Sequence, residues 1–121
     1  MKVAVIGSRG LRVEGLEQYL PPQTSQIISG GAKGVDACAR DWALAHGVPL
    51  REFLPQYEVY GRAAPLRRNL TIIRHADLVL AFWDGQSRGT KYVIENCKRL
   101  GVPCRVYLPK DLNSPLSSPA R

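Results

Sequence analysis

The chain has 121 residues, with 17 basic and 10 acidic side chains and a net charge of +7. That length is typical of one domain, and it suffices to bury a core without disulfides or a metal. No apolar run approaches the ~18 residues of a membrane span. The N-terminus lacks the pattern of a signal peptide, so we expect a cytoplasmic protein. The basic excess favours anionic partners such as nucleotides or nucleic acid.

The three cysteines, Cys38, Cys97 and Cys104, form no C-x-x-C pair, and the two histidines have no ligand spacing to them. Isolated cysteines of this kind are typically small buried hydrophobic residues. We therefore predict no metal site.

Apolar runs and helix-period patterns alternate along the sequence. Strands are expected over residues 3–6, 26–29, 50–54, 77–83 and 104–108, and helices over about 11–20, 36–46, 65–76 and 90–100. The first strand is a continuous apolar run, which is typical of parallel strands covered on both faces. This order predicts a three-layer α/β fold, one domain over residues 1–108 with a five-stranded parallel sheet in the order 3-2-1-4-5. Residues 109–121 are rich in proline and serine, which predicts either a linker or an arm that docks on a partner.

Helical spacing predicts which side chains face the core. They are Leu16, Tyr19 and Leu20 in the first helix, Leu66, Leu70, Ile73 and Ala76 in the third, and Val93, Ile94, Cys97 and Leu100 in the fourth. Asn69 falls on the inner face of the third helix, where a buried amide must be paired, so it bonds either a loop backbone or a ligand. The connection over residues 55–64 is longer than usual and predicts a wall of a binding site.

Three glycine-bearing loops follow the first, second and fourth strands. They are Gly7 to Gly10, Ser29 to Asp36 and Asp84 to Thr90. In the expected strand order these strands are neighbours, so all three loops would line one edge of the sheet. Glycine lets the backbone approach a ligand closely, and unpaired N–H groups at a helix start suit an anion. We therefore expect a phosphate-binding site here, first of all in the loop from Ser29 to Asp36, where Lys33 adds a cation.

The side chains of these loops have separate expected roles. Hydroxyl groups donate to phosphate oxygens, although Thr90 could instead cap its helix. Asp36 either favours the helix dipole or accepts a hydrogen bond from a ribose hydroxyl. An aromatic ring, from Tyr57, Tyr60, Phe82 or Trp83, could stack on a base, although core packing is the stronger expectation for Phe82. The predicted ligand-binding residues are Gly7, Ser8, Arg9, Ser29, Gly30, Gly31, Lys33, Gly34, Asp36, Tyr60, Arg68, Asn69, Trp83, Asp84, Gly85, Ser87, Arg88, Gly89 and Thr90.

Several motifs together resemble the SLOG superfamily, and most of all its small single-domain bacterial branch described as YspA-like or YpsA-related. The motifs are Gly7-Ser8-Arg9, the loop from Ser29 to Asp36, Tyr60-Gly61-Arg62, Arg68-Asn69 and the segment from Phe82 to Thr90. The resemblance implies a Rossmann-like domain that binds a nucleotide or a nucleotide-derived ligand such as ADP-ribose, NAD or AMP, as a sensor in signalling or conflict systems.

Two better-known relatives imply other activities. Lonely-guy phosphoribohydrolases cleave nucleoside monophosphates, and an N-glycoside hydrolase of that kind would need Asp36, Asp84 or Glu95 as its acid. The glycine loop is longer here than in those enzymes, and Glu95 lies one helical turn too far along. The DNA-processing protein A family shares the Ser-Gly-Gly-Ala loop and binds single-stranded DNA, but its second domain and histidine pattern are absent from this chain.

Three functions thus remain open: nucleotide binding, N-glycoside hydrolysis and single-stranded nucleic-acid binding. Nucleic acid would bind along the basic edge, with an affinity that falls steeply with salt. Helix faces in such small domains often pair, so we also expect a homodimer.

Overall fold

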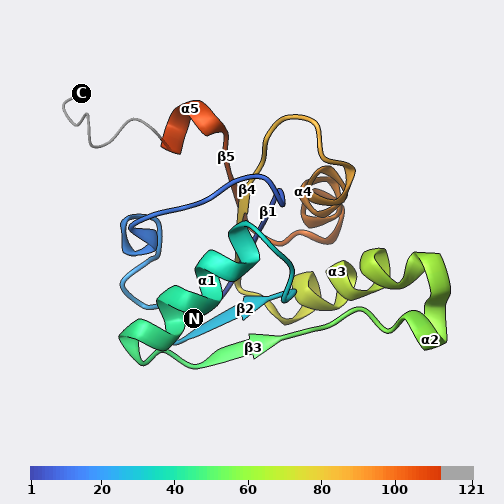
Figure 1. Ribbon diagram of the computed structural model, residues 1–121, viewed down its shortest axis with the longest axis horizontal. Coiled ribbons are helices and arrows are strands. Elements are labelled where there is room, and N and C mark those ends of the chain that lie inside the picture. Colours follow the sequence, from blue (N-terminus) through green and yellow to red (C-terminus); the bar gives the residue numbers. More distant parts are fainter. Residues whose placement is uncertain (113–121) are drawn as a thin grey trace.

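The computed structural model describes residues 1–112, and its five strands form one parallel sheet in the order β3-β2-β1-β4-β5 (Figure 1). The strands are β1 (Lys2–Gly7), β2 (Gln26–Ser29), β3 (Leu50–Glu52), β4 (Leu78–Phe82) and β5 (Cys104–Tyr107). This order confirms the predicted Rossmann-like α/β fold. The switch point lies between β1 and β4, which pair along their length from Val3 opposite Leu78 to Gly7 opposite Phe82.

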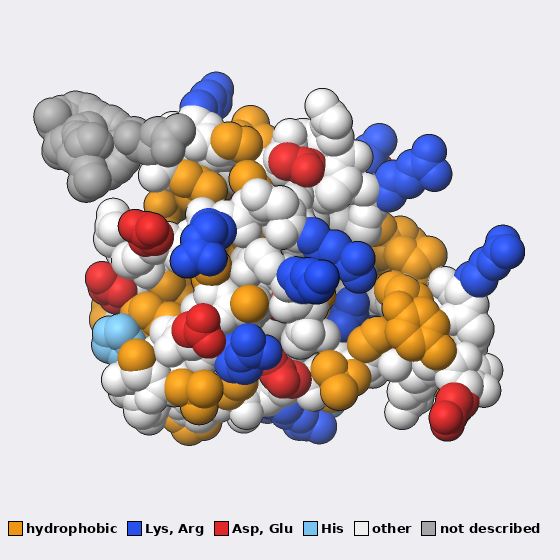
Figure 2. All heavy atoms as spheres, viewed as in Figure 1, with side chains coloured by type: hydrophobic (Ala, Val, Ile, Leu, Met, Phe, Trp, Pro, Cys, Tyr) orange, Lys and Arg blue, Asp and Glu red, His pale blue; other side chains and the backbone are white. Residues whose placement is uncertain are grey.

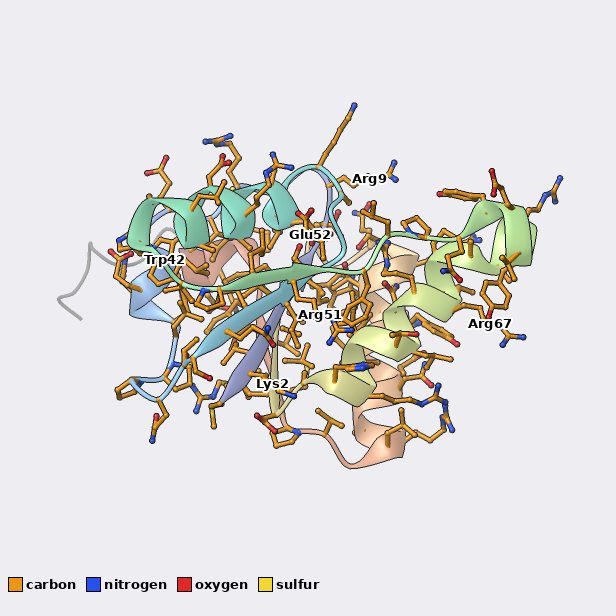
Figure 3. All side chains as sticks on the ribbon, turned by 90° about the horizontal axis from the view of Figure 1, so that it is seen from below. Lys2, Arg9, Trp42, Arg51, Glu52 and Arg67 are labelled. Carbon is orange, nitrogen blue, oxygen red and sulfur yellow. The ribbon has the colours of Figure 1, made fainter. Side chains whose placement is uncertain are left out.

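Helices cover both faces of the sheet, as Figures 1 and 3 show. The main helices are α1 (Val35–His46), α3 (Ala64–His75) and α4 (Arg88–Leu100), and the short ones are α2 (Tyr57–Tyr60), α5 (Pro109–Leu112) and the 3-10 turns η1 (Leu16–Gln18) and η2 (Gly61–Ala63). On one face α1 and η1 pack on the sheet, and on the other face α3 and α4 do. Among residues 1–112, no helix has the length and apolar character needed to span a bilayer.

The strands supply side chains to both cores in alternation. Val3, Val5 and Phe82 point to the α1 side, whereas Ala4 and Ile6 point to the α3 and α4 side. Each of these side chains is at least nine-tenths buried. A sheet covered on both faces explains why its strands are continuous apolar runs in the sequence.

The prediction of a helix over residues 11–20 is wrong. This stretch holds only η1, and Gly15 just before it has a left-handed backbone with φ 64°. A residue in that conformation interrupts a right-handed helix. The inward faces were nevertheless predicted correctly, since Leu16 is buried and Tyr19 and Leu20 pack against the core.

Two other predictions on helix faces are wrong, because Leu66 is 39% exposed and Leu100 is 36% exposed. Leu66 is in the first turn of α3, and the start of this helix extends past the sheet toward α2 (Figure 1). Leu100 is the last residue of α4, next to the Gly101 that caps it. Helix α4 begins two residues earlier than predicted, so Thr90 lies within its first turn and does not cap it.

The remaining predictions concern cysteines and the tail. Cys97 is buried, as predicted, while Cys38 and Cys104 are half-buried. The tail begins with α5, whose Leu112 packs against the core. The prediction for the rest of the tail falls on residues 113–121, outside those that the structure describes.

Candidate functional site

A cleft of about 270 Å³ lies at the carboxyl edge of the sheet, between the loops that follow β1, β2 and β4. One wall comes from α3 and another from the first turns of α4. It is lined by Ile6, Gly7, Ser8, Arg9, Gly30, Ala32, Asp36, Pro65, Arg68, Asn69, Ile72, Ser87, Gly89, Thr90 and Val93. The three glycine-bearing loops thus meet at one site, where the strand order predicted them.

The cleft brings together part of the predicted binding set. Its lining includes Gly7, Ser8, Arg9, Gly30, Asp36, Arg68, Asn69, Ser87, Gly89 and Thr90. The other predicted residues do not line it: Ser29, Gly31, Lys33, Gly34, Tyr60, Trp83, Asp84, Gly85 and Arg88, together with the candidate acid Glu95. Sequence reasoning missed Ile6, Ala32, Pro65, Ile72 and Val93. Two of these five, Ile6 and Val93, were assigned to a strand and to an inner helix face, and those positions continue to the rim of the cleft.

A pair of serine hydroxyls joins the first and third loops. Ser8 Oγ and Ser87 Oγ are 2.9 Å apart, and Ser8 Oγ also accepts a hydrogen bond from the Asp84 N–H at 3.1 Å. Ser8 is 2% exposed, and its own N–H donates to the Phe82 carbonyl. Whichever serine donates within the pair, the hydroxyl hydrogen of the other is left to point toward a ligand.

The loop before α4 is held by its own side chains. Asp84 Oδ1 accepts hydrogen bonds from the backbone N–H groups of Gln86 and Ser87, both at 2.8 Å. These bonds, that of Ser87 above all, lower the pKa of Asp84. The indole N–H of Trp83 donates to the Ser87 carbonyl at 3.0 Å. Asp84 and Trp83 therefore support the cleft without lining it.

The N-terminus of α4 offers unpaired donors to the cleft. Ser87 occupies the N-cap position, but its side chain makes no capping hydrogen bond. The first N–H groups of an α-helix have no partner within it, and the helix dipole makes this end positive. Gly89 and Thr90 of this first turn both line the cleft. Arg9, which lies between α1 and α3 in Figure 3, adds a cation.

Asp36 places a buried carboxylate in the same cleft. The residue is 5% exposed, and its Oδ2 accepts a hydrogen bond from the Ala32 N–H at 3.1 Å. Among residues 1–112, Asp36 Oδ1 has no hydrogen-bond partner although it is buried. Desolvation raises the pKa of Asp36, and the Ala32 N–H and the charge of Arg68 offset this in part.

Arg68 crosses from α3 to the loop after β2. Its Nη1 donates to the carbonyls of Gly30 at 2.6 Å and Phe53 at 3.2 Å, and its Nε donates to Asn69 Oδ1 at 2.8 Å. Desolvation lowers the pKa of Arg68, while the Asp36 carboxylate opposes that shift. Asn69 thus bonds a neighbouring side chain, an option that the prediction of a loop or ligand partner did not include.

At Gly7 and Gly30, neighbouring atoms come too close to the backbone for any side chain. A Cβ at Gly30 would lie 2.6 Å from Arg68 Nη1 and 3.0 Å from Asp36 Oδ2. A Cβ at Gly7 would lie 2.5 Å from the Phe82 carbonyl oxygen and 2.8 Å from Val35 Cβ. Gly30 therefore keeps the two charged side chains close together, and Gly7 lets α1 pack tightly on the sheet.

The loop from Ser29 to Asp36 differs from the predicted phosphate cradle. Lys33 is exposed, and Ser29 is fully buried with its hydroxyl near the Gly31 N–H. Figure 2 shows basic side chains gathered in the middle of one face, over the part of the molecule where β2 is joined to α1 in Figure 1. The carboxylate of Asp36, rather than the ammonium group of Lys33, lies at the start of α1 inside the cleft.

Comparisons with known proteins agree with this architecture. A family model described as "YspA, cpYpsA-related SLOG family" matches residues 1–60, which include the loops after β1 and β2. The Gene 61 protein of Mycobacterium phage D29 is 30% identical over 93 residues, which cover 72% of this chain and 74% of that protein.

The chain belongs to the YspA, cpYpsA-related SLOG family. This confirms the resemblance seen in the sequence motifs. Membership in the SLOG family fits a nucleotide-related function. No solved structure matches the chain.

Proposed function

We propose that the cleft binds a nucleotide or a nucleotide-derived ligand, with a phosphate at the start of α4 and a ribose beside Asp36. The two ends of the cleft differ in polarity. One end has helix N–H donors and a hydroxyl hydrogen, and the other has a buried carboxylate. A ribose phosphate has the same polarity, because its phosphate only accepts hydrogen bonds and its sugar hydroxyls donate them.

The start of α4 suits the phosphate better than the start of α1 does. At α1 the Asp36 carboxylate already occupies the positive end of the helix dipole and would repel a second anion. At α4 no acidic residue lies in the first turn. Charge-assisted hydrogen bonds contribute about 1.5–3 kcal/mol each, so two or three of them could hold a phosphate with micromolar affinity.

The unpartnered Oδ1 of Asp36 is the observation that carries the proposal. A buried carboxylate oxygen without a donor costs free energy, and natural proteins keep few of them. A hydroxyl donor from the ligand would satisfy it without adding charge to the cleft. Ribose offers such donors on the carbon atoms remote from its phosphate.

Ligand-induced thermal stabilisation tests the proposal. We expect AMP, NAD or ADP-ribose to raise the melting temperature in a saturable way, with a stabilisation of about 2.7 kcal/mol at a ligand concentration of 100 Kd. The variant Asp36→Ala should bind at least tenfold more weakly than wild type. The matched control is Asp41→Ala, because Asp41 lies on α1 with its side chain 76% exposed. The proposal fails if no nucleotide shifts the melting temperature.

A second function, N-glycoside hydrolysis, is favoured by the same carboxylate. Asp36 is buried in the cleft, and its pKa is raised by desolvation, as is common for catalytic acids. By contrast, Glu95 is exposed on α4, and Asp84 bonds its own loop. Release of free base from AMP or NAD, lost in Asp36→Asn, would establish this activity. Ligand binding without base release would leave the protein a binding module.

A further inference from the structure

We infer that a cleft between α3 and the segment that follows β3 docks an acidic, partly apolar segment of a partner protein. This α3 cleft has a volume of about 450 Å³. It opens on another face of α3 than the cleft beside Asp36, which Pro65, Asn69 and Ile72 line. The inference adds an interaction surface and does not depend on nucleotide binding.

The α3 cleft follows one side of its helix. Arg67, Thr71 and Arg74 line it at spacings of four and three residues, so their side chains lie along the same face. Tyr60 lines it from the connection over residues 55–64. The sequence predicted that this long connection walls a binding site.

Apolar side chains in and beside the α3 cleft are exposed to solvent. Leu54 is 63% exposed and Tyr60 is 40% exposed, and both line the cleft. Val59 and Leu66, which are chain neighbours of lining residues, are exposed as well. Exposed apolar groups that gather in one place mark interaction sites, and tyrosine and arginine are enriched where proteins bind each other.

The charges in the α3 cleft are of one sign. Arg67, Arg68 and Arg74 line it, and no carboxylate does. Arg68 is bonded to two backbone carbonyls, but within residues 1–112 neither Arg67 nor Arg74 forms a salt bridge. The guanidinium group of Arg51 lies 4.5 Å above the Phe53 ring, between β3 and α3 (Figure 3). Guanidinium groups are well matched to carboxylates, so the missing counter-charge is one that an acidic partner would supply.

The sign of these charges disfavours other copies or parts of this chain as the occupant. A second copy related by a two-fold axis would bring the same arginines against each other, and like charges repel. Residues 113–121 carry no acidic side chain, so they lack the counter-charge. The occupant is therefore a different protein.

A free sheet edge beside the α3 cleft favours a protein over a nucleic acid. Strand β3 is the edge of the sheet, and in the part of the chain that the structure describes it pairs only with β2. Phe53 and Leu54 follow β3 directly and line the cleft. An extended peptide can hydrogen-bond to the unpaired backbone of an edge strand, whereas nucleic acid is bound mainly through phosphate contacts.

Selection of peptides from a random library on the immobilised full chain tests the inference. We expect the enriched peptides to contain Asp or Glu around a Leu, Phe or Tyr. Each should bind at least ~10-fold more weakly to Arg67→Glu and to Arg74→Glu, because like charges then face each other. The control Arg105→Glu makes the same change on β5, at the opposite edge of the sheet, and should leave the affinity unchanged. The melting temperature of each variant without peptide checks its fold.

A charge-swapped peptide gives a second test. Replacing the acidic residues of a selected peptide by Lys should abolish binding to the wild type and restore binding to the double variant Arg67→Glu/Arg74→Glu. Such a rescue requires the peptide to lie against these two side chains.

Three results would overturn the inference. They are a selection that enriches no acidic peptide, equal losses of affinity in the cleft variants and in Arg105→Glu, and displacement of the peptide by an oligothymidylate that binds the cleft at least as tightly. None of them bears on nucleotide binding, because no residue of the cleft beside Asp36 is changed.

Discussion

The Asp36 side chain is desolvated by the fold, and among the described residues only one of its two oxygens is paired. Replacing a charged group of this kind by a neutral group of the same shape removes the desolvation cost and keeps the acceptor for the Ala32 N–H. We expect Asp36→Asn to raise the free energy of unfolding by about 1 kcal/mol, within the range for unsatisfied buried polar groups. Urea denaturation at neutral pH measures it, and Asp41→Asn, an exposed change on the same helix, should have no effect.

The gain in Asp36→Asn should depend on pH with a definite sign. Because the folded state raises the pKa of Asp36 above its ordinary value of 3.8, the folded protein holds this proton more tightly than the unfolded chain does. The contribution of Asp36 to the free energy of unfolding of the wild type is therefore fully present below pH 3.8. It is lost as pH rises through the pKa of Asp36 in the folded state. Across that pH interval the Asp36→Asn variant should have a higher free energy of unfolding than the wild type, and in acid the two proteins should be equally stable. An advantage that is constant with pH would contradict the assignment.

The sequence predicted much of the site at this scale but not how the residues are used. Asp36, Arg68 and Ser8 were all predicted to bind ligand, and all three line the cleft. Helical spacing places Asp36 on the same face as the core residues Ala39 and Ala43, three and seven residues further on, but it does not show which groups close over the carboxylate. The loop after β2 bonds the carboxylate through Ala32, four residues away, whereas the side chain of Arg68 comes from α3, a long-range contact that spacing within α1 does not show.

At the scale of elements, the approach of α1 to the sheet depends on Gly7. A methyl group there would meet the Phe82 carbonyl and Val35, and neither can move without displacing β4 or α1. We expect Gly7→Ala to lower the free energy of unfolding by about 1–3 kcal/mol, as overpacking does. Thermal and urea denaturation measure the loss. Gly10→Ala is the matched control, because a Cβ at Gly10 would meet no atom within 4 Å, and equal effects of the two changes would refute the steric explanation.

Elements with a continuous apolar run or a long helical repeat were predicted well. Strand β2 has the predicted bounds, and α1 begins one residue before the prediction. Residues 11–20 were predicted wrongly because their apolar spacing alone favours a helix. Packing of Leu16, Tyr19 and Leu20 on the core requires only one 3-10 turn, and the left-handed Gly15 precedes it. Helix α2 was expected only as a long connection, since its four residues are too few for a periodic signal.

At the scale of the whole molecule, a net charge of +7 should make stability depend on salt. Only Arg40 and Asp41 form a salt bridge within residues 1–112, so repulsion among basic side chains is weakly balanced by pairing. We expect the melting temperature to rise by about 2–4 °C as NaCl increases from ~10 mM to ~150 mM, because the Debye length falls from roughly 30 to 8 Å. Near the sequence pI of 9.7 the rise should shrink. A melting temperature that falls with salt would show that attractive pairs dominate.

The strand order of the sheet was predictable from the alternation of strands and helices along the whole chain. Alternating strands and helices with right-handed crossovers allow few topologies, and the doubly wound order brings the loops after β1, β2 and β4 to one edge. The cleft of about 450 Å³ between α3 and the segment that follows β3 was not predictable in this way. It depends on how far α3 extends past the sheet and on where the β3–α2 segment folds against it, and neither is set by the alternation of elements.

The contact between Trp83 and Ser87 gives the protein an intrinsic optical probe of the cleft. The indole N–H is bonded to the carbonyl of the residue that precedes α4, so an anion drawn to that helix start changes the electric field across the indole ring. Trp42, the other fluorophore of this type, packs with α1 on the opposite face of the sheet and bonds Glu17. Ligand occupancy can therefore be followed by tryptophan emission without a label, with Trp83→Phe identifying the source of the signal.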